Sequence, residues 1–219
     1  SFSKSALTMP QQLLLKMLHC RNRFKTDNYS VTDWVSHPQI CRAAELLKQQ
    51  AVVAYPTESV WGIGCDPQSA SAVEKILQLK NRNVEKGLIL IADSIERFEP
   101  FLAGLDKEHL HRFREPTVKP TTWLVPNNGC APLWITGGRD TLALRITTHP
   151  VAAALCKLLG GPLVSTSANP QGLPAAKSAT EVESYFGAAI DGQTPGQVGD
   201  ALNPSEIRYL ISGEIVRAG

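Results

Sequence analysis

The sequence has no C-x-x-C pair, and its five cysteines are scattered over 219 residues. An odd and dispersed set argues against a disulfide framework and against a cysteine zinc site. Long apolar runs are missing too, because Leu13-Leu14-Leu15 is followed at once by Lys16, whereas a membrane span needs roughly 20 apolar residues. These absences predict a soluble protein of the reducing cytoplasm, with no membrane as a partner.

Common ligand motifs are also lacking. The chain contains no G-x-x-x-x-G-K-[ST] loop, and Gly62-Ile63-Gly64 is too short for the dinucleotide-binding fingerprint. No H-E-x-x-H segment or comparable spacing of carboxylates and imidazoles occurs, so we expect no metal site built from protein side chains alone. Any Mg²⁺ would arrive with the phosphates of a nucleotide.

The net charge is only +2, because 22 Lys and Arg face 20 Asp and Glu. An affinity for anions would therefore depend on locally grouped cations. The hydrophobic fraction of 43% and the charged fraction of 19% are typical of a folded globular protein. We predict one folded domain over residues 38–219.

Acidic residues are absent from the first 26 positions, which contain five Lys or Arg. Organelle transit peptides share this bias, but it is equally that of a basic, loosely ordered extension or leading helix. We favour the second interpretation and treat residues 1–37 as an N-terminal extension whose order the sequence does not define.

Strand-like and helix-like segments alternate along the rest of the chain, as apolar spacing and Gly or Pro breaks indicate. The expected strands are 51–55, 88–92, 122–125, 141–147, 163–164, 207–211 and 214–216. The expected helices are 43–47, 69–79, 95–102, 107–113, 150–159 and 179–186. A turn is expected over 62–67. Strands separated by helices imply an α/β fold, and the closely spaced final strands favour a mixed sheet.

Two cations, Lys80 and Arg82, stand at the end of a predicted helix rather than in a core, and Lys86 follows in the next loop. They would suit a triphosphate, although cations at a helix C-terminus are also common without any ligand. The segment Ser165-Thr166-Ser167-Ala168-Asn169 follows a buried strand and could cradle an anion, or form an ordinary polar turn. For His149, a capping or surface role is favoured over catalysis.

These segments together resemble the YrdC family, and within it the TsaC-type threonylcarbamoyl-AMP synthases. The family pattern of K-x-R followed far downstream by S-x-N is met by Lys80-Asn81-Arg82 and Ser167-Ala168-Asn169. Other segments in family order are Tyr55-Pro56-Thr57-Glu58, Gly62-Ile63-Gly64-Cys65-Asp66, Lys86-Gly87-Leu88-Ile89-Leu90, Asp140-Thr141-Leu142-Ala143-Leu144-Arg145 and Asn203-Pro204-Ser205-Glu206-Ile207-Arg208. The resemblance runs from about residue 40 to the end.

The resemblance implies a twisted, open, mixed α/β sheet flanked by helices, with an electropositive concave surface. It also implies a nucleotidyltransferase that joins L-threonine, bicarbonate and ATP into threonylcarbamoyl-AMP, releasing pyrophosphate. The product would feed a separate transferase complex that makes threonylcarbamoyladenosine in tRNA. The residues that the resemblance assigns to ATP are Lys80, Arg82, Thr141, Ser167 and Asn169. Those that it assigns to threonine are Thr57, Arg145, Ser165 and Ser205.

Two positions depart from the family pattern. Asn83 replaces a common Pro after K-x-R, which loosens a loop that Pro would stiffen. Lys119 replaces a permissive Gly near the presumed cleft. Either change could tune or impair activity.

Two other functions remain open. The chain could be a non-catalytic YrdC-type module that binds double-stranded RNA or tRNA and acts in ribosomal RNA maturation. Such binding would depend strongly on salt and would be indifferent to threonine. A carbamoyl-transfer domain of a larger hydrogenase-maturation protein is less favoured, because zinc-finger and acylphosphatase-like segments are missing.

Overall fold

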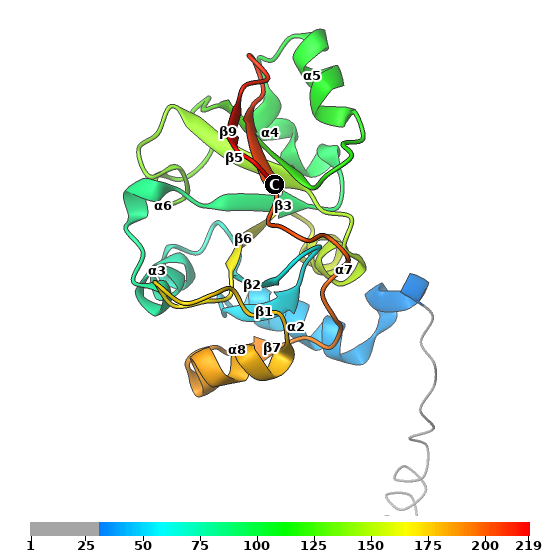
Figure 1. Cartoon of the computed structure of the whole chain (residues 1–219), viewed down its shortest axis with the longest axis vertical. Helices are drawn as coiled ribbons and strands as arrows, with labels where there is room; N and C mark the ends of the chain where they lie inside the picture. Colours follow the sequence, from blue (N-terminus) through cyan, green and yellow to red (C-terminus); the bar gives the residue numbers. More distant parts are fainter. Residues whose placement is uncertain (1–30) are drawn as a thin grey trace, which may run out of the picture. The chain divides into compact units, whose positions relative to one another are not determined.

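One sheet of nine strands organises the part of the chain that the structure describes, residues 31–219 of a computed structural model (Figure 1). Residues Asp33–Gly219 form one compact unit. The extension predicted at residues 1–37 lies largely outside the described residues. The prediction of a domain over 38–219 stays a prediction.

The strand order is β7-β1-β2-β6-β3-β5-β4-β8-β9. The strands are β1 (Val53–Pro56), β2 (Trp61–Gly64), β3 (Ile89–Ala92), β4 (Thr121–Pro126), β5 (Thr141–Ile146), β6 (Leu163–Ser167), β7 (Gly192–Gln193), β8 (Glu206–Tyr209) and β9 (Ile215–Arg217). Three neighbouring pairs run parallel, namely β1 with β7, β3 with β5 and β4 with β8, and the other pairs run antiparallel. The predicted mixed α/β sheet is confirmed.

Helices flank this sheet. The α-helices are α2 (Pro38–Lys48), α3 (Ala70–Lys80), α4 (Glu99–Leu102), α5 (Lys107–Arg114), α6 (Leu133–Thr136), α7 (Pro150–Leu159) and α8 (Ala179–Phe186). The 3₁₀-helices are η1 (Val31–Ser36), η2 (Val84–Lys86), η3 (Ile95–Phe98) and η4 (Gly187–Ala189). The predicted helices over 150–159 and 179–186 coincide with α7 and α8, whereas the one expected over 95–102 is split between η3 and α4.

Local capping explains several helix boundaries. The Ser69 hydroxyl accepts a hydrogen bond from the Ala72 amide at 3.3 Å and starts α3. A capping box between Ser178 and Glu181 starts α8. Helix α3 ends where Asn81 adopts the left-handed conformation at φ 47°, which turns the chain directly after Lys80.

The two faces of the sheet are covered unequally. Alternate strand residues point to opposite faces, and Ala54, Leu90 and Val164 share one core with side chains of α3, α4, α5, α6 and α8. Tyr55 and Ile91 share the other core with α2 and α7. Because α2 and α7 pack over β1, β3, β6 and β7, the same face of the sheet is left open toward β4, β5 and β8.

The prediction of a turn over 62–67 was wrong for residues 62–64, which belong to strand β2. This strand pairs with β1 through Tyr55↔Gly62 and Val53↔Gly64, and buries Trp61 and Ile63. Glycine is favoured here by packing rather than by a turn, since a Cβ on Gly64 would overlap the Val164 carbonyl oxygen. Strand β7 and helix α6 were also not predicted from the sequence.

The sequence predicted neither a disulfide framework nor a membrane span. Cys41, Cys65, Cys130 and Cys156 are free thiols, and Cys20 lies outside the described residues. Among residues 31–219 no helix is long and apolar enough to cross a membrane.

Gly64→Ala is expected to destabilise the fold, because the added methyl would collide with the Val164 carbonyl and lie 2.7 Å from the Tyr55 hydroxyl oxygen. Overpacking of this kind costs roughly 1–3 kcal/mol of unfolding free energy. Urea unfolding measures the loss. Gly161→Ala is the matched control, since no atom lies within 4 Å of its added Cβ. Equal stability of the two variants would contradict this packing account.

Candidate functional site

A cleft of about 490 Å³ opens over the uncovered half of the sheet face. Its floor follows the register of the strands, in which Ser165 pairs with Ile89, Ile89 with Ala143, and Ala143 with Leu124. Its walls come from the β1–β2 turn, the loop after α3, the α6–β5 loop and the β8–β9 region. Its size is that of ordinary small-molecule sites.

The cleft is lined by cations and by no carboxylate. The lining cations are Arg82, Lys86, Arg139, Arg145 and Arg217. They reach the cleft from different elements, so that positive charge surrounds it although the chain as a whole is nearly neutral. Guanidinium and ammonium groups gathered in a concave site favour ligands with several negative charges.

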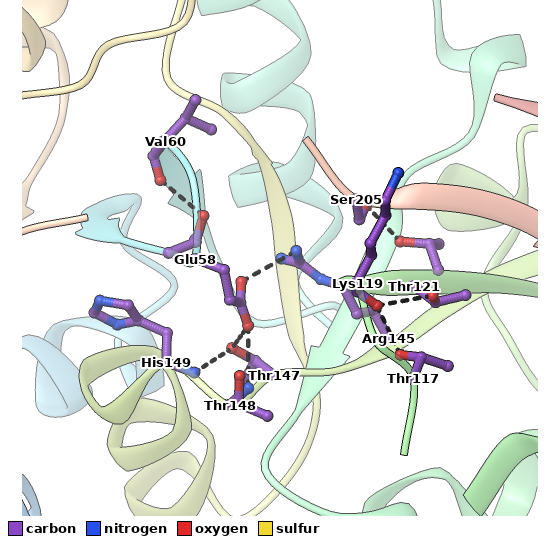
Figure 2. Close-up of polar contacts among 12 residues, drawn as sticks. Glu58, Val60, Thr117, Lys119, Thr121, Arg145, Thr147, Thr148, His149 and Ser205 are labelled. Carbon is purple, nitrogen blue, oxygen red and sulfur yellow. Dashed lines mark hydrogen bonds and ion pairs between the residues drawn. The ribbon is translucent and has the colours of Figure 1, made fainter. Parts of the chain in front are cut away.

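Arg145 lies on β5 and is held from one side by Glu58 of the β1–β2 turn (Figure 2). Its Nη1 lies 3.1 Å from Glu58 Oε2, and its side chain is 8% exposed. The Arg145 Nε atom is buried without a hydrogen-bond partner among the described residues. Its Nη2 has no recorded hydrogen-bond partner in residues 31–219 either, and because Arg145 lines the cleft, this atom can donate to a ligand or water.

Glu58 itself is held by the segment after β5. Its Oε1 accepts hydrogen bonds from the Thr147 hydroxyl at 2.7 Å and from the Thr148 amide at 3.0 Å (Figure 2). Burial alone would raise the pKa of Glu58, but Arg145 and the Thr147 hydroxyl outweigh it and hold that pKa below its ordinary value. Glu58 is thus a carboxylate that fixes the guanidinium.

His149 does not lie on the surface, so that expectation was wrong. It is buried at the N-cap of α7, where its ring makes no capping bond and its Nε2 lies 2.9 Å from the Gln197 carbonyl oxygen. Burial lowers the pKa of His149, partly offset by the Gln197 carbonyl and Glu58. Burial therefore favours the neutral form of this ring.

Lys80 was expected to be accessible at a helix end, but it is buried, with 6% of its surface exposed. Its ammonium group donates to the Ser167 carbonyl, to the Asn169 carbonyl at 2.9 Å and to Asn169 Oδ1 at 3.2 Å. An ammonium has three N–H donors, and all three are used. Lys80 therefore ties α3 to the Ser167–Asn169 turn from behind.

Seven of the nine predicted site residues line the cleft, and two do not. Those that line it are Thr57, Arg82, Thr141, Arg145, Ser165, Ser167 and Ser205. Lys80 and Asn169 are not among the lining residues, and Asn169 Oδ1, which accepts from Lys80, also accepts a hydrogen bond from the Ser167 hydroxyl at 2.6 Å. The predicted residues thus form two layers, a lining layer and a supporting layer.

Comparison with known proteins identifies the family. The family model described as "Telomere recombination", which covers Sua5, YciO and YrdC proteins, matches residues 45–219. The chain belongs to the Sua5/YciO/YrdC family. The predicted family is thereby confirmed.

Curated relatives share most of their length with this chain. A protein of Cellvibrio japonicus (strain Ueda107) named "Threonylcarbamoyl-AMP synthase" is 51% identical over 185 residues, which are 84% of this chain and 98% of the relative. A protein of the same name from Stutzerimonas stutzeri (strain A1501) is 49% identical over 187 residues, or 85% of this chain and 98% of the relative.

Solved structures share the fold. Sua5 of P. abyssi, complexed with L-threonine, superimposes with a TM-score of 0.72 and 30% identity over 80% of this chain. The match covers 52% of the P. abyssi protein, so this chain spans about half its length. E. coli YciO gives a TM-score of 0.71 at 22% identity, covering 81% of this chain and 87% of YciO.

Asn83 and Lys119, the two departures from the family pattern, both make hydrogen bonds in the structure. The Asn83 side chain accepts a hydrogen bond from the Glu85 amide at 2.9 Å and caps η2, so it holds the loop locally where Pro would restrict it. Lys119 does not line the cleft, and its ammonium donates to the Gly219 carbonyl at 3.1 Å.

Arg139 and Arg217 line the cleft but were not identified from the sequence. Arg217 lies one residue beyond the predicted strand 214–216, at the end of β9, and its Nη2 donates to the Ser205 carbonyl at 2.6 Å. Burial and then the charge of Arg145 lower the pKa of the Arg217 guanidinium. Pairing of β8 with β9 was predictable, but which of their side chains face the cleft was not.

The buried Lys80 makes unfolding depend on pH. Burial and then the charge of Arg82 lower the pKa of Lys80 from 10.5 to about 8. As pH rises from about 8 to about 10, the folded protein loses this proton before the unfolded chain does, so the free energy of unfolding increases. Relative to Lys80→Met, wild-type protein should therefore gain stability over this window in urea titrations. A difference that stays constant or falls with pH would contradict the assignment.

Proposed function

We propose that this chain is a threonylcarbamoyl-AMP synthase, forming threonylcarbamoyl-AMP and pyrophosphate from L-threonine, bicarbonate and ATP. The observation that carries the proposal is a cleft lined by five cations and no carboxylate, in a chain 51% identical to a relative bearing that name. The substrates of this reaction are all anionic or carry a carboxylate, which matches such a lining.

The threonine end of the cleft centres on Arg145. Its guanidinium lines the cleft and pairs with Glu58 only through Nη1, so it has donors left for a carboxylate, which a guanidinium binds with two parallel hydrogen bonds. The hydroxyls of Thr57, Ser165 and Ser205 line the same cleft and can contact the amino and hydroxyl groups of threonine. The relative from P. abyssi, solved with L-threonine, supports this assignment.

The nucleotide end of the cleft uses Arg82 and Thr141 as lining contacts to phosphate oxygens, while Ser167, whose hydroxyl donates to Asn169 Oδ1, offers its oxygen to the accompanying Mg²⁺. Arg82 is anchored through Nη2 to the Gly87 carbonyl at 2.9 Å, while its Nε is buried without a partner in the described chain. Lys80 and Asn169 contribute by holding the Ser167 turn rather than by touching phosphate. This revises their role from direct contacts to positioning.

The chemistry suits a site that aligns anions. The threonine amine and bicarbonate form a carbamate and water, and a carbamate oxygen then attacks the α-phosphorus of ATP. The new P–O bond forms as the bond from the α-phosphorus to the bridging oxygen breaks, and pyrophosphate leaves with the electron pair. Fixed cations around the phosphates stabilise the charge that moves onto the leaving group. No protein base is required for this step.

Bicarbonate, Mg²⁺ and later partners extend the proposal. Among residues 31–219 no three His, Cys, Asp or Glu side chains group as a metal site. A Mg²⁺ ion would thus take its ligands from ATP phosphates and water, with the Ser167 hydroxyl within the same cleft. The product would pass to a transferase that modifies tRNA. Direct tRNA binding by the same cations stays an alternative use of the cleft.

The test is pyrophosphate release by purified protein supplied with ATP, Mg²⁺ and bicarbonate, with and without L-threonine. Release should require threonine, because the carbamate that attacks ATP is made from it. Arg145→Ala should lower kcat/KM for threonine by about 100-fold, which corresponds to loss of charged hydrogen bonds. Arg97→Ala is the matched control, since Arg97 pairs with Asp93 outside the cleft.

Threonine-independent release, or none from protein with a normal unfolding transition, would reject the synthase proposal. Salt-sensitive tRNA binding by such inactive protein would favour the RNA-binding alternative.

A further inference from the structure

Two loops at one end of the cleft are packed into a single unit. The α6–β5 loop lies against η2, because a Cβ on Gly137 would overlap the Val84 carbonyl oxygen and lie 3.0 Å from Glu85 Cα. Gly137 also has φ 64°, which favours glycine. The Leu88 amide donates to the Ile135 carbonyl at 2.9 Å, which joins the two segments again. Side chains carried by either loop therefore have fixed relative positions.

Arg139 is carried by this unit and lines the cleft. Its Nε donates to the Glu85 carbonyl at 2.7 Å, and its own carbonyl accepts from Asn127 Nδ2 at 3.1 Å. Both Nη atoms have no hydrogen-bond partner among the described residues. The guanidinium is therefore oriented by the protein and still has its terminal donors available.

Positive charge is concentrated here without compensation. Arg139 is close enough to Arg82 that its charge, after burial, lowers the pKa of the Arg82 guanidinium. Lys86 lines the same end of the cleft. Within residues 33–219 no carboxylate forms an ion pair with any of these three, and the Glu85 carboxylate accepts from Asn83 Nδ2 instead. Like charges held together cost free energy, which a bound polyanion would relieve.

The position of this cluster is set by β5. Thr141 begins the strand two residues after Arg139, and Arg145 lies four residues beyond Thr141, or about 13 Å along the strand. The cations of the loop unit and the Arg145 guanidinium thus occupy opposite ends of one cleft. That separation suits a ligand with phosphate at one end and a carboxylate at the other.

We propose that Arg139 is a further substrate-binding residue, which with Arg82 and Lys86 holds the β- and γ-phosphates of ATP and the departing pyrophosphate. The assignment rests on the proposed synthase function. As the bond between the α-phosphorus and the bridging oxygen breaks, that oxygen gains negative charge. A guanidinium already oriented by the Glu85 carbonyl stabilises this charge without reorganisation.

The test compares Arg139→Ala, Arg139→Lys and the control Arg42→Ala, which removes an exposed arginine of α2 that does not line the cleft. Calorimetry measures binding of magnesium pyrophosphate, and steady-state assays give KM for ATP and threonine. Arg139→Ala should weaken pyrophosphate binding and raise KM for ATP by about 10-fold each, the usual loss for one charged hydrogen bond. KM for threonine should not change.

Arg139→Lys retains the charge but not the fork of two donors, so its pyrophosphate affinity should fall between wild type and Arg139→Ala. Pyrophosphate affinity in Arg139→Ala equal to that of Arg42→Ala would overturn the assignment, as would an equal rise in KM for threonine. The binding measurement needs no turnover. If the wild-type protein has no threonine-dependent activity but Arg139→Ala still weakens its pyrophosphate binding, the phosphate site is supported and the synthase function is rejected.

Discussion

The buried pair of Glu58 and Arg145 is the contact on which the rest of the site depends. Burying two charges costs solvation free energy, and the attraction between the charges alone rarely offsets that cost. Here the cost is offset by hydrogen bonds to Glu58 from Thr147 and Thr148, so the pair joins the β1–β2 turn to β5 and to the start of α7. The outcome is a rigid guanidinium that still has N–H donors left for a ligand.

The cleft exists because the sheet face around Arg145 is covered unevenly. Helices α2 and α7 fill one half of that face with apolar side chains, and the other half exposes a floor that runs from Ser165 through Ile89 and Ala143 to Leu124. Cations then reach the cleft from β5, from β9 and from the two loop segments that carry Arg82, Lys86 and Arg139. A chain with nearly balanced charge thereby forms a strongly positive cavity. The concave shape concentrates the electric field of these cations, which strengthens the attraction for anionic ligands.

Much of the fold followed from local patterns, and much of the site did not. Helix α7 was predictable because Pro150 and Gly160 bound an apolar repeat, while β2 was missed because its two glycines read as a turn. The burial of Lys80 could not be read from its place at a helix end, since it depends on the Ser167 turn, 87 residues away. Arg139 was missed for a similar reason, because its orientation comes from contact between two loops.

The central claim is that Arg145, fixed by Glu58, recognises the carboxylate of threonine. The most direct measurement is pyrophosphate release with L-threoninol, which keeps the amine, side chain and stereochemistry of threonine but replaces its carboxylate with an alcohol. The account predicts that threoninol supports release at least about 100-fold less efficiently than threonine, by kcat/KM, and that Arg145→Ala reduces this preference. Equal use of both compounds by the wild-type protein would contradict it.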